Sequence, residues 1–265
     1  MSSLNYVFLG VKDFCDALKN SLKWLYLGLI DIQLRYRRSI IGPWWVTIST
    51  GIMVATLGFL WSKIFGTNIS TYRPFFAIGY VIWGWMSSQI IDASQGFSQF
   101  ESTILQINQA FHIYILRLVV RQTLILLHNS VIVLIVLVFI GNGIPLTSLI
   151  SIPALIIVQM IIFFASVTIA IFCTRFRDMV QVVASLVQIV FFLSPILWDS
   201  SSLKGKAYLV ELNPVYHWIE IIRAPLLGVV PSLSSWIWSL ATLLFAAIIS
   251  FYFLGRYKTR IAYWI

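Results

Sequence analysis

The chain passes from a basic segment into its first long apolar run at Arg35-Tyr36-Arg37-Arg38-Ser39-Ile40-Ile41-Gly42-Pro43-Trp44-Trp45. Proline disfavours helical geometry in the residue before it and is tolerated in the first turn of a helix. One helix is therefore expected to end near Gly42 and another to begin beside Pro43. The stretch predicts that the chain enters a membrane here from a basic side.

The composition supports a membrane protein. Of the 265 residues 60% are hydrophobic and only 10% are charged, which is more apolar than one soluble core of this size can bury. A membrane-spanning helix needs roughly 20 apolar residues. We predict an all-α integral membrane protein, with a cytosolic segment 1–43 and a transmembrane domain 44–265. The six predicted spans are 44–65, 75–98, 115–140, 149–173, 179–198 and 236–254.

Basic residues indicate the orientation of these spans, because they gather on the cytosolic side of membrane helices. With the N-terminus in the cytosol, the five on the outer flanks are Lys63, Arg73, Lys204, Lys206 and Arg223. The thirteen on the inner flanks are Lys12, Lys19, Lys23, Arg35, Arg37, Arg38, Arg117, Arg121, Arg175, Arg177, Arg256, Lys258 and Arg260. Both termini are therefore expected in the cytosol. The same bias accounts for most of the net charge of +9, so nucleic-acid binding is not expected.

An amphipathic interface helix is predicted from Asp16 to Arg38, and Asp31 is expected to pair with Arg35 one turn later. Such a helix can simply anchor the protein to anionic membrane lipids. Its apolar arc is wider than one membrane surface covers, which favours an additional cytosolic partner. Both interpretations stay open. The apolar face of this helix consists of Leu18, Leu22, Leu25, Leu29, Ile32 and Tyr36, at steps of three and four residues.

The segment 199–235 is predicted to be a re-entrant helical hairpin on the outer side. Its apolar part, Tyr216 to Leu227, is too short to span a membrane. Glu220 and Arg223 stand one helical turn apart and can neutralise each other. A structural ion pair and a substrate contact are the two interpretations of these residues.

Three aromatic residues, Phe76, Tyr80 and Trp83, share one face of the second predicted span with Ser87. Sugar rings stack on flat aromatic faces, and their hydroxyl groups bond to polar tips. We therefore predict that this face lines a glycan path. Ordinary helix packing is the alternative.

Little in the sequence indicates catalysis. There is no G-x-x-x-x-G-K-[ST] phosphate loop, so the chain is not expected to bind ATP by that device. His112, His128 and His217 are scattered without metal-ligand spacing, and Asp92 is the one acid near the bilayer interior, expected to face a wet cavity. An ion channel or secondary transporter would show buried charges or repeated broken helices. A membrane-embedded glycosyl or phospho transferase would need acids and a metal or nucleotide site on its cytosolic loops.

Several short stretches together resemble one family over nearly the whole chain, the permease subunits of bacterial type-2 polysaccharide ABC exporters, including the Wzm-like O-antigen permeases. Arg117, Arg121 and His128-Asn129 look like the O-antigen branch rather than the teichoic acid branch. The stretches are Arg35 to Trp44, Arg117-Leu-Val-Val-Arg121 with His128-Asn129, Phe176-Arg-Asp178, Ser194-Pro-Ile-Leu-Trp198, Leu212-Asn-Pro214 and Arg223-Ala-Pro-Leu-Leu-Gly228.

The resemblance implies a homodimer in the bacterial inner membrane that exports a lipid-linked O-antigen polysaccharide, or alternatively a capsular polysaccharide or teichoic acid. It also implies two cytosolic ATPase subunits, which would bind ATP and Mg²⁺, and no cofactor of the chain itself. Three sets of residues are assigned to such an exporter. They are Arg35, Arg37, Arg38 and Ser39 for the lipid pyrophosphate, Lys23, Glu101 and Gln106 for coupling to the ATPase, and Glu220 with Arg223 for a periplasmic gate. The arginines of the first set are expected at headgroup level, where guanidinium groups suit phosphate oxygens, and a role in topology and lipid contact is their alternative.

Overall fold

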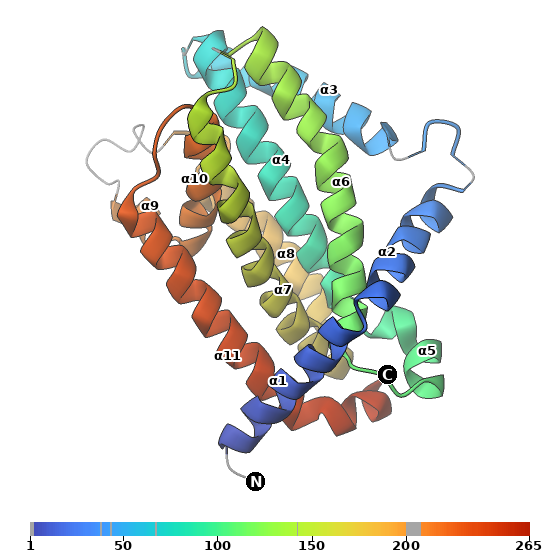
Figure 1. Cartoon of the computed structure of the whole chain (residues 1–265). Coiled ribbons are helices and arrows are strands. Elements are labelled where there is room, and N and C mark those ends of the chain that lie inside the picture. The colour runs from blue at the N-terminus through green and yellow to red at the C-terminus, as the bar shows by residue number, and fades with distance from the viewer. Residues whose placement is uncertain (1–2, 38, 43, 67, 142, 200–207) are drawn as a thin grey trace.

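The structure of the chain is a computed structural model, which describes residues 3–37, 39–42, 44–66, 68–141, 143–199 and 208–265 (Figure 1). All regular elements in these residues are helices, so the predicted all-α class is confirmed. They are α1 (Ser3–Lys19), α2 (Ser21–Tyr36), α3 (Trp44–Ile64), α4 (Ile69–Ser94), η1 (Ser98–Phe100), α5 (Glu101–Gln106), α6 (His112–Phe139), η2 (Leu146–Ile150), α7 (Ser151–Arg175), α8 (Met179–Leu193), α9 (Tyr208–Glu211), α10 (Pro214–Leu226) and α11 (Leu233–Trp264).

Four helical segments among the described residues are long and apolar enough to cross a membrane: α3, α6, η2 with α7, and α11. They coincide with four of the predicted spans. α8 is apolar but has only 15 residues, and α4 has 26 residues but includes several charged and polar ones. A multi-pass membrane protein is therefore supported. The crossing by α4 and α8, and with it the count of six spans, stays a prediction.

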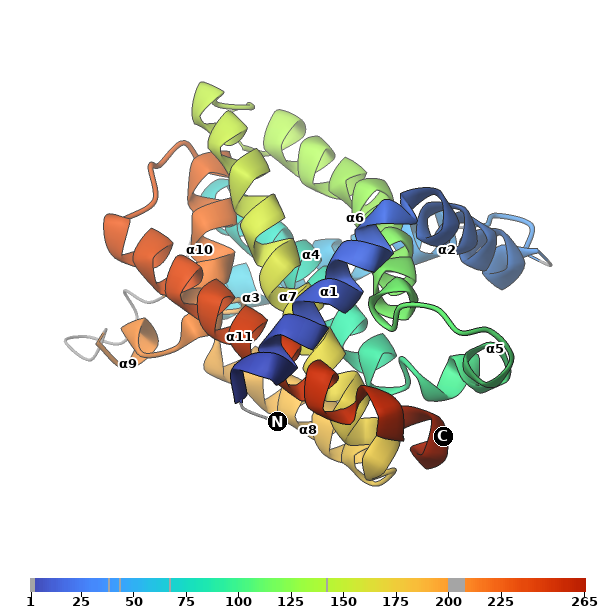
Figure 2. The same cartoon turned by 60° about the horizontal axis from the view of Figure 1, so that its bottom comes forward.

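The N-terminal segment forms two helices, so the prediction of one helix from Asp16 to Arg38 is wrong. The break lies at Asn20, whose side-chain Nδ2 donates to the carbonyl oxygen of Asp16 at 2.8 Å and thereby closes the end of α1. Asparagine side chains compete with helical bonding in this way. α1 crosses α11, while α2 runs along the first half of α6 (Figures 1 and 2).

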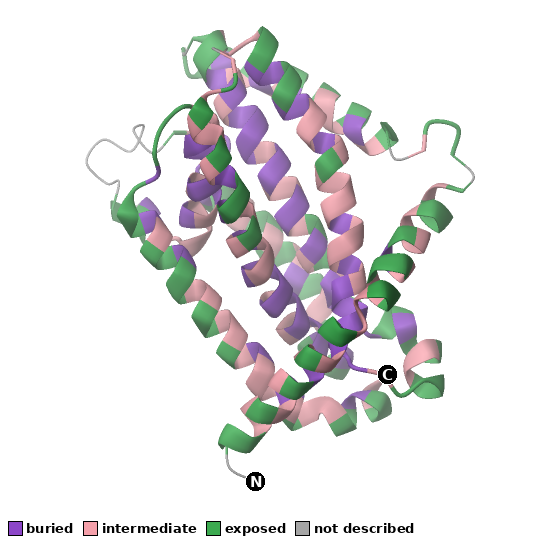
Figure 3. Ribbon diagram, in the orientation of Figure 1, coloured by how far each residue is buried: buried purple, intermediate pink, exposed green. Residues whose placement is uncertain are grey.

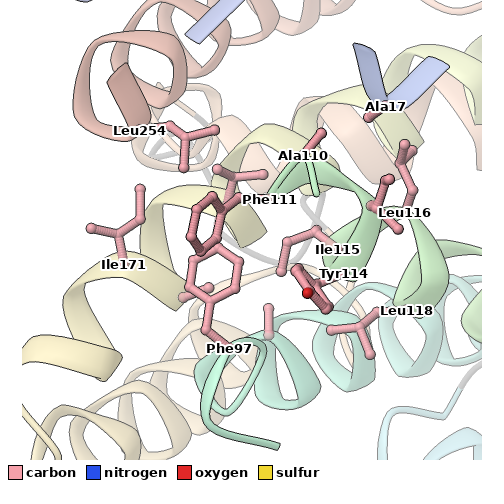
Figure 4. Close-up of a cluster of buried hydrophobic side chains, with 14 of the residues drawn as sticks. Ala17, Phe97, Ala110, Phe111, Tyr114, Ile115, Leu116, Leu118, Ile171 and Leu254 are labelled. Atoms are coloured by element: carbon pink, nitrogen blue, oxygen red, sulfur yellow. The ribbon is translucent and has the colours of Figure 1, made fainter. Parts of the chain in front are cut away.

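α4 and α7 lie at the centre of the bundle and carry many of its buried side chains (Figure 3). A cluster of buried hydrophobic side chains joins the start of α6 to α1, α7 and α11, at the end of the molecule that carries both termini (Figure 4). There Phe97 and Phe111 meet edge to face with ring centroids 5.5 Å apart. Such an aromatic pair contributes about 1 kcal/mol beyond the area it buries. The cluster fixes the start of α6.

The predicted hairpin region contains a helix, α10, that packs against α4, α7 and α11. Asn213 begins it, because its side-chain oxygen accepts from the backbone N–H of Val215 at 3.0 Å, and Pro214 occupies the first turn. The short helix α9 precedes it. Residues 200–207 of the predicted hairpin, including Lys204 and Lys206, lie outside the described residues. Whether α10 re-enters the membrane stays a prediction.

Candidate functional site: a groove between α3, α4, α6 and α8

A groove of about 410 Å³ lies between α3, α4, α6 and α8. Tyr80, Trp83 and Ser87, three of the four predicted path residues, line it from α4. Phe191 of α8 adds a further ring. The helical spacing of these α4 residues thus puts two aromatic rings and a hydroxyl on one wall. This wall has the chemistry that the sequence predicts for a sugar-binding surface.

Phe76, the fourth predicted path residue, lies in the core instead. Its side chain is fully buried, and its ring stacks on Tyr72 at a centroid distance of 6.1 Å and an interplanar angle of 3°. Leu57, Trp61 and Leu197 cover the same cluster. Because these residues close that face of α4 at the level of Phe76, the aromatic ladder divides: Phe76 serves helix packing and Tyr80 begins the groove.

Polar side chains that were not predicted to line a glycan path also line the groove. They come from four helices. The sequence pattern could have identified them, because a polar residue inside a membrane-length apolar run faces a functional cavity by default. Charged residues and histidine are absent from the groove lining within the described part of the chain. The groove is therefore aromatic and polar but uncharged. These additional polar residues are Thr50 of α3, Ser88 of α4, Asn129 of α6 and Gln188 of α8.

A second cavity of about 370 Å³ lies on the other side of Trp83, between α4, α7, α8 and α10. Trp83, Ser87 and Val187 line both cavities. Only Val183 of α8 is buried, so α8 is attached to the bundle along a narrow line with a hollow on each side. The two hollows differ in chemistry, because this second cavity is lined almost entirely by apolar side chains.

The start of α6 is held by an acidic residue from α1. Asp13 is buried and accepts from the backbone N–H groups of Phe111 at 3.2 Å and His112 at 3.1 Å, which caps α6 from a distant helix. His112 Nδ1 lies 2.8 Å from the carboxylate and Lys258 Nζ lies 2.6 Å from it. Burial raises the pKa of Asp13, but the bonds and charges of His112 and Lys258 outweigh it and hold that pKa below its ordinary value.

Two further acids hold the next turns of α6. Both carboxylate oxygens of Asp31 in α2 accept from Arg117, and the guanidinium carbon of Arg117 also lies 4.4 Å from the ring centroid of Phe100. Asp92 of α4 accepts from Arg121 at 2.7 Å. α1, α2 and α4 therefore each contribute one acid to the first half of α6. The sequence predicted that Asp92 faces a wet cavity. In the structure its carboxylate is paired with Arg121.

The arginines proposed for the pyrophosphate are free of ion pairs where they are described. Arg35 and Arg37 are exposed at the end of α2, close to the exposed Ser39. The predicted pair of Asp31 with Arg35 is wrong, because Asp31 binds the arginine of α6 described above. Arg38 lies outside the described residues.

The predicted gate pair is formed within α10: Arg223 Nη2 donates to Glu220 Oε2 at 2.8 Å. Arg223 is buried, and its Nη1 donates to the carbonyl oxygen of Pro195 at 2.7 Å. Its guanidinium carbon also lies 4.0 Å from the ring centroid of Phe75 on α4. Arg223 therefore fastens the chain that leaves α8 to both α10 and α4. Gate function itself stays a prediction.

The residues predicted to couple to an ATPase are exposed at the end of the molecule that carries the termini. Lys23 lies in the first turn of α2, and Glu101 and Gln106 begin and end α5 (Figure 2). Their side chains are available to a partner at that end.

A bundle with several membrane-length helices around an uncharged polar groove has the architecture of a membrane transporter subunit. The chain belongs to the ABC-2 type transporter family, whose model matches residues 24–227. It is 21% identical over 203 residues to the O-antigen export system permease protein RfbA of Myxococcus xanthus, a match that covers 72% of this chain and 76% of that relative. The resemblance to type-2 ABC permeases is confirmed. Membership of the family also implies an ABC ATPase as partner.

Proposed function

We propose that the protein is the transmembrane subunit of an ATP-driven exporter that moves lipid-linked O-antigen polysaccharide from the cytoplasm to the periplasm across the inner membrane. Membership of the ABC-2 family and the likeness to an O-antigen export permease support the transport class and the substrate. The observation that carries the proposal further is the groove that combines Tyr80, Trp83 and uncharged polar groups.

The chemistry of the groove suits a sliding polymer. An aromatic ring that stacks on a sugar contributes on the order of 1 kcal/mol, the value typical of aromatic pairs. Several such contacts in series hold a chain weakly at each step. A site with a buried charge would bind one ion or one charged group much more tightly. The uncharged lining therefore favours neutral sugar units as the passing substrate.

Membership of the ABC-2 family supports the remaining parts of the proposed exporter. The working unit is a homodimer with two cytosolic ATPase subunits, which hold the ATP and Mg²⁺, and both termini lie in the cytosol. Lys23, Glu101 and Gln106 face these subunits in our proposal. Crosslinkers at Lys23 and Glu101 are expected to reach the ATPase, and crosslinks only to lipid would contradict this assignment.

The lipid end of the substrate is proposed to meet the end of α2. Arg35 and Arg37 are exposed there, and guanidinium groups bind phosphate oxygens with two parallel hydrogen bonds. Arg38 and Ser39 complete this set in the sequence. The phosphates of the bilayer headgroups lie at the same level. In this proposal, the residues bind the lipid pyrophosphate where the substrate enters the transporter from the membrane surface.

The test is inactivation of the gene in the organism that encodes it, followed by complementation. Loss of O-antigen from the cell surface, with lipid-linked glycan accumulating inside and normal synthesis, is the expected result. Loss of a capsule or of teichoic acid instead would show that the protein exports that polymer rather than O-antigen. Among the described residues, the groove lining offers no basic side chain for the phosphates of teichoic acid. Unchanged glycans in all three classes would overturn the proposal.

A further inference from the structure

Most polar side chains that line the groove make no hydrogen bond to another described residue. Thr50, Ser88, Asn129 and Gln188 make no side-chain hydrogen bond within the described residues, whereas Ser87 donates to the carbonyl oxygen of Gly84 at 3.2 Å. Gln188 is the tenth residue of α8, which puts it about 14 Å along the helix from Met179. The other end of α8, Leu193, lies about 8 Å beyond it, so Gln188 stands inside the helix rather than in a terminal turn. Lipid tails offer no hydrogen bonds there.

Asn129 differs from the others because it is buried. The residue is 8% exposed, it lines the groove, and its Oδ1 is buried without a hydrogen-bond partner among the described residues. The preceding residue is satisfied: His128 Nδ1 lies 2.7 Å from the carbonyl oxygen of Leu124, and its ring meets Trp44 edge to face. A buried amide without hydrogen bonds is costly. The Nδ2 of the same amide makes no hydrogen bond within the described residues and is not enclosed, so the contents of the groove can accept from the amide there.

The partner that fits this amide offers an acceptor to Nδ2 and carries no charge. An asparagine amide accepts at Oδ1 and donates at Nδ2, and a sugar hydroxyl can do both in return. No acidic or basic residue lines the groove among the described residues, so nothing there neutralises a charged ligand. Tyr80 and Trp83 provide ring faces beside this amide, as sugar rings require.

We propose that Asn129 is a specificity-determining contact that binds the hydroxyl groups of neutral sugar units as they pass through the groove. This inference rests on the proposed function and adds to it the recognised group and the residue that recognises it. Thr50, Ser88 and Gln188 extend the same uncharged lining to the other three helices.

The experiment compares Asn129→Thr with Asn129→Val in the complete exporter with its ATPase. Thr and Val have the same shape, so only the hydroxyl group separates them. The rate of glycan export per exporter is measured in cells, and protein level and dimer state are measured in detergent. Ser166→Ala is the control, because Ser166 in α7 is also buried with an unpartnered hydroxyl but does not line the groove.

We expect Asn129→Val to export about 3- to 10-fold more slowly than wild type, the effect of losing one hydrogen bond to an uncharged group. Asn129→Thr should recover part of that loss, and Ser166→Ala should match wild type. Equal export by the Thr and Val variants, both present as normal dimers, would overturn the inference and leave the proposed function intact. Dissociation of the Val variant alone into monomers would also overturn it, because Asn129 would then serve the subunit contact. A wild-type exporter that moves no glycan would instead refute the proposed function.

Discussion

Gly10 of α1 and Gly255 of α11 face each other where the two helices cross. A Cβ added to Gly255 would lie 3.1 Å from the backbone nitrogen of Gly10 and would overlap the carbonyl oxygen of Tyr6. A Cβ on Gly10 would overlap the carbonyl oxygen of Phe251. Glycine lets helix backbones approach this closely. The crossing brings Asp13 of α1 within reach of the start of α6.

The first prediction tests this crossing. Gly255→Ala is expected to push α1 away from α11 and to lower the free energy of unfolding by about 2 kcal/mol, a typical cost of overpacking. Thermal unfolding in detergent would show it. Gly51→Ala is the control, because the nearest atoms to its added Cβ lie 3.9 Å away in ordinary contact. Equal unfolding midpoints for the two variants would show that α1 and α11 separate at no cost.

The second prediction concerns the ion pair between Asp31 and Arg117. Only 11% and 14% of these side chains are exposed, so Arg117→Ala leaves a carboxylate with little water and should cost about 2 kcal/mol of stability. A double-mutant cycle with Asp31→Ala measures the coupling. The exposed pair Asp16–Lys19 is the control, where loss of the pair should cost less than about 1 kcal/mol. A coupling energy near zero for Asp31–Arg117 would contradict the prediction.

The third prediction is the pH dependence of the Asp13 contact. The pKa of Asp13 lies below its ordinary value of 3.8, so its stabilising effect is complete above that value and is lost as the pH falls through the lower, folded-state pKa. Protease resistance of α1 should therefore stay constant between about pH 7 and pH 8, above the range near pH 6.5 in which the imidazole of the neighbouring His112 takes up a proton in the unfolded chain. Asp13→Asn should weaken that resistance across this range. Equal resistance in the variant would show that the cap is dispensable.

The fourth prediction concerns the exposed arginines at the end of α2. Replacing Arg35 and Arg37 by Ala should lower export without changing membrane insertion or assembly with the ATPase. Lysine should rescue only part of the loss, because it offers a point charge without the planar fork of a guanidinium. Quantifying surface glycan in both variants checks this. Complete rescue by lysine would reduce their role to membrane topology.

The fifth prediction separates the two parts of the aromatic ladder. Trp83→Leu and Tyr80→Leu should slow export at normal protein levels, because both rings line the groove. Phe76→Leu should instead lower thermal stability by about 1 kcal/mol, a typical cost of a hydrophobic exchange in a core, with export unchanged. Export rate and unfolding midpoint are measured for all three variants. Wild-type export by the Trp83 and Tyr80 variants would show that these rings serve helix packing and not the glycan path.

The sequence by itself determined the class of the protein. Its apolar runs are local features, because a helix in lipid must satisfy its backbone bonds within one segment. Helix positions and the family could therefore be predicted from stretches such as Trp44–Ile64 and the motif around Arg35. The pair Glu220–Arg223 was also predictable, since its partners stand one turn apart in the same helix.

Only the tertiary structure decided which side chains meet across helices. Asp31 binds Arg117, 86 residues away, rather than Arg35 one turn away, because α2 packs along α6. Phe76 and Tyr80 share a helix face, yet neighbouring residues cover one and leave the other at the groove. Asn129 lines a groove only because α3, α4 and α8 pack around its own helix, α6. A helical repeat fixes the face on which a residue lies, whereas the packing of other helices fixes what that face touches.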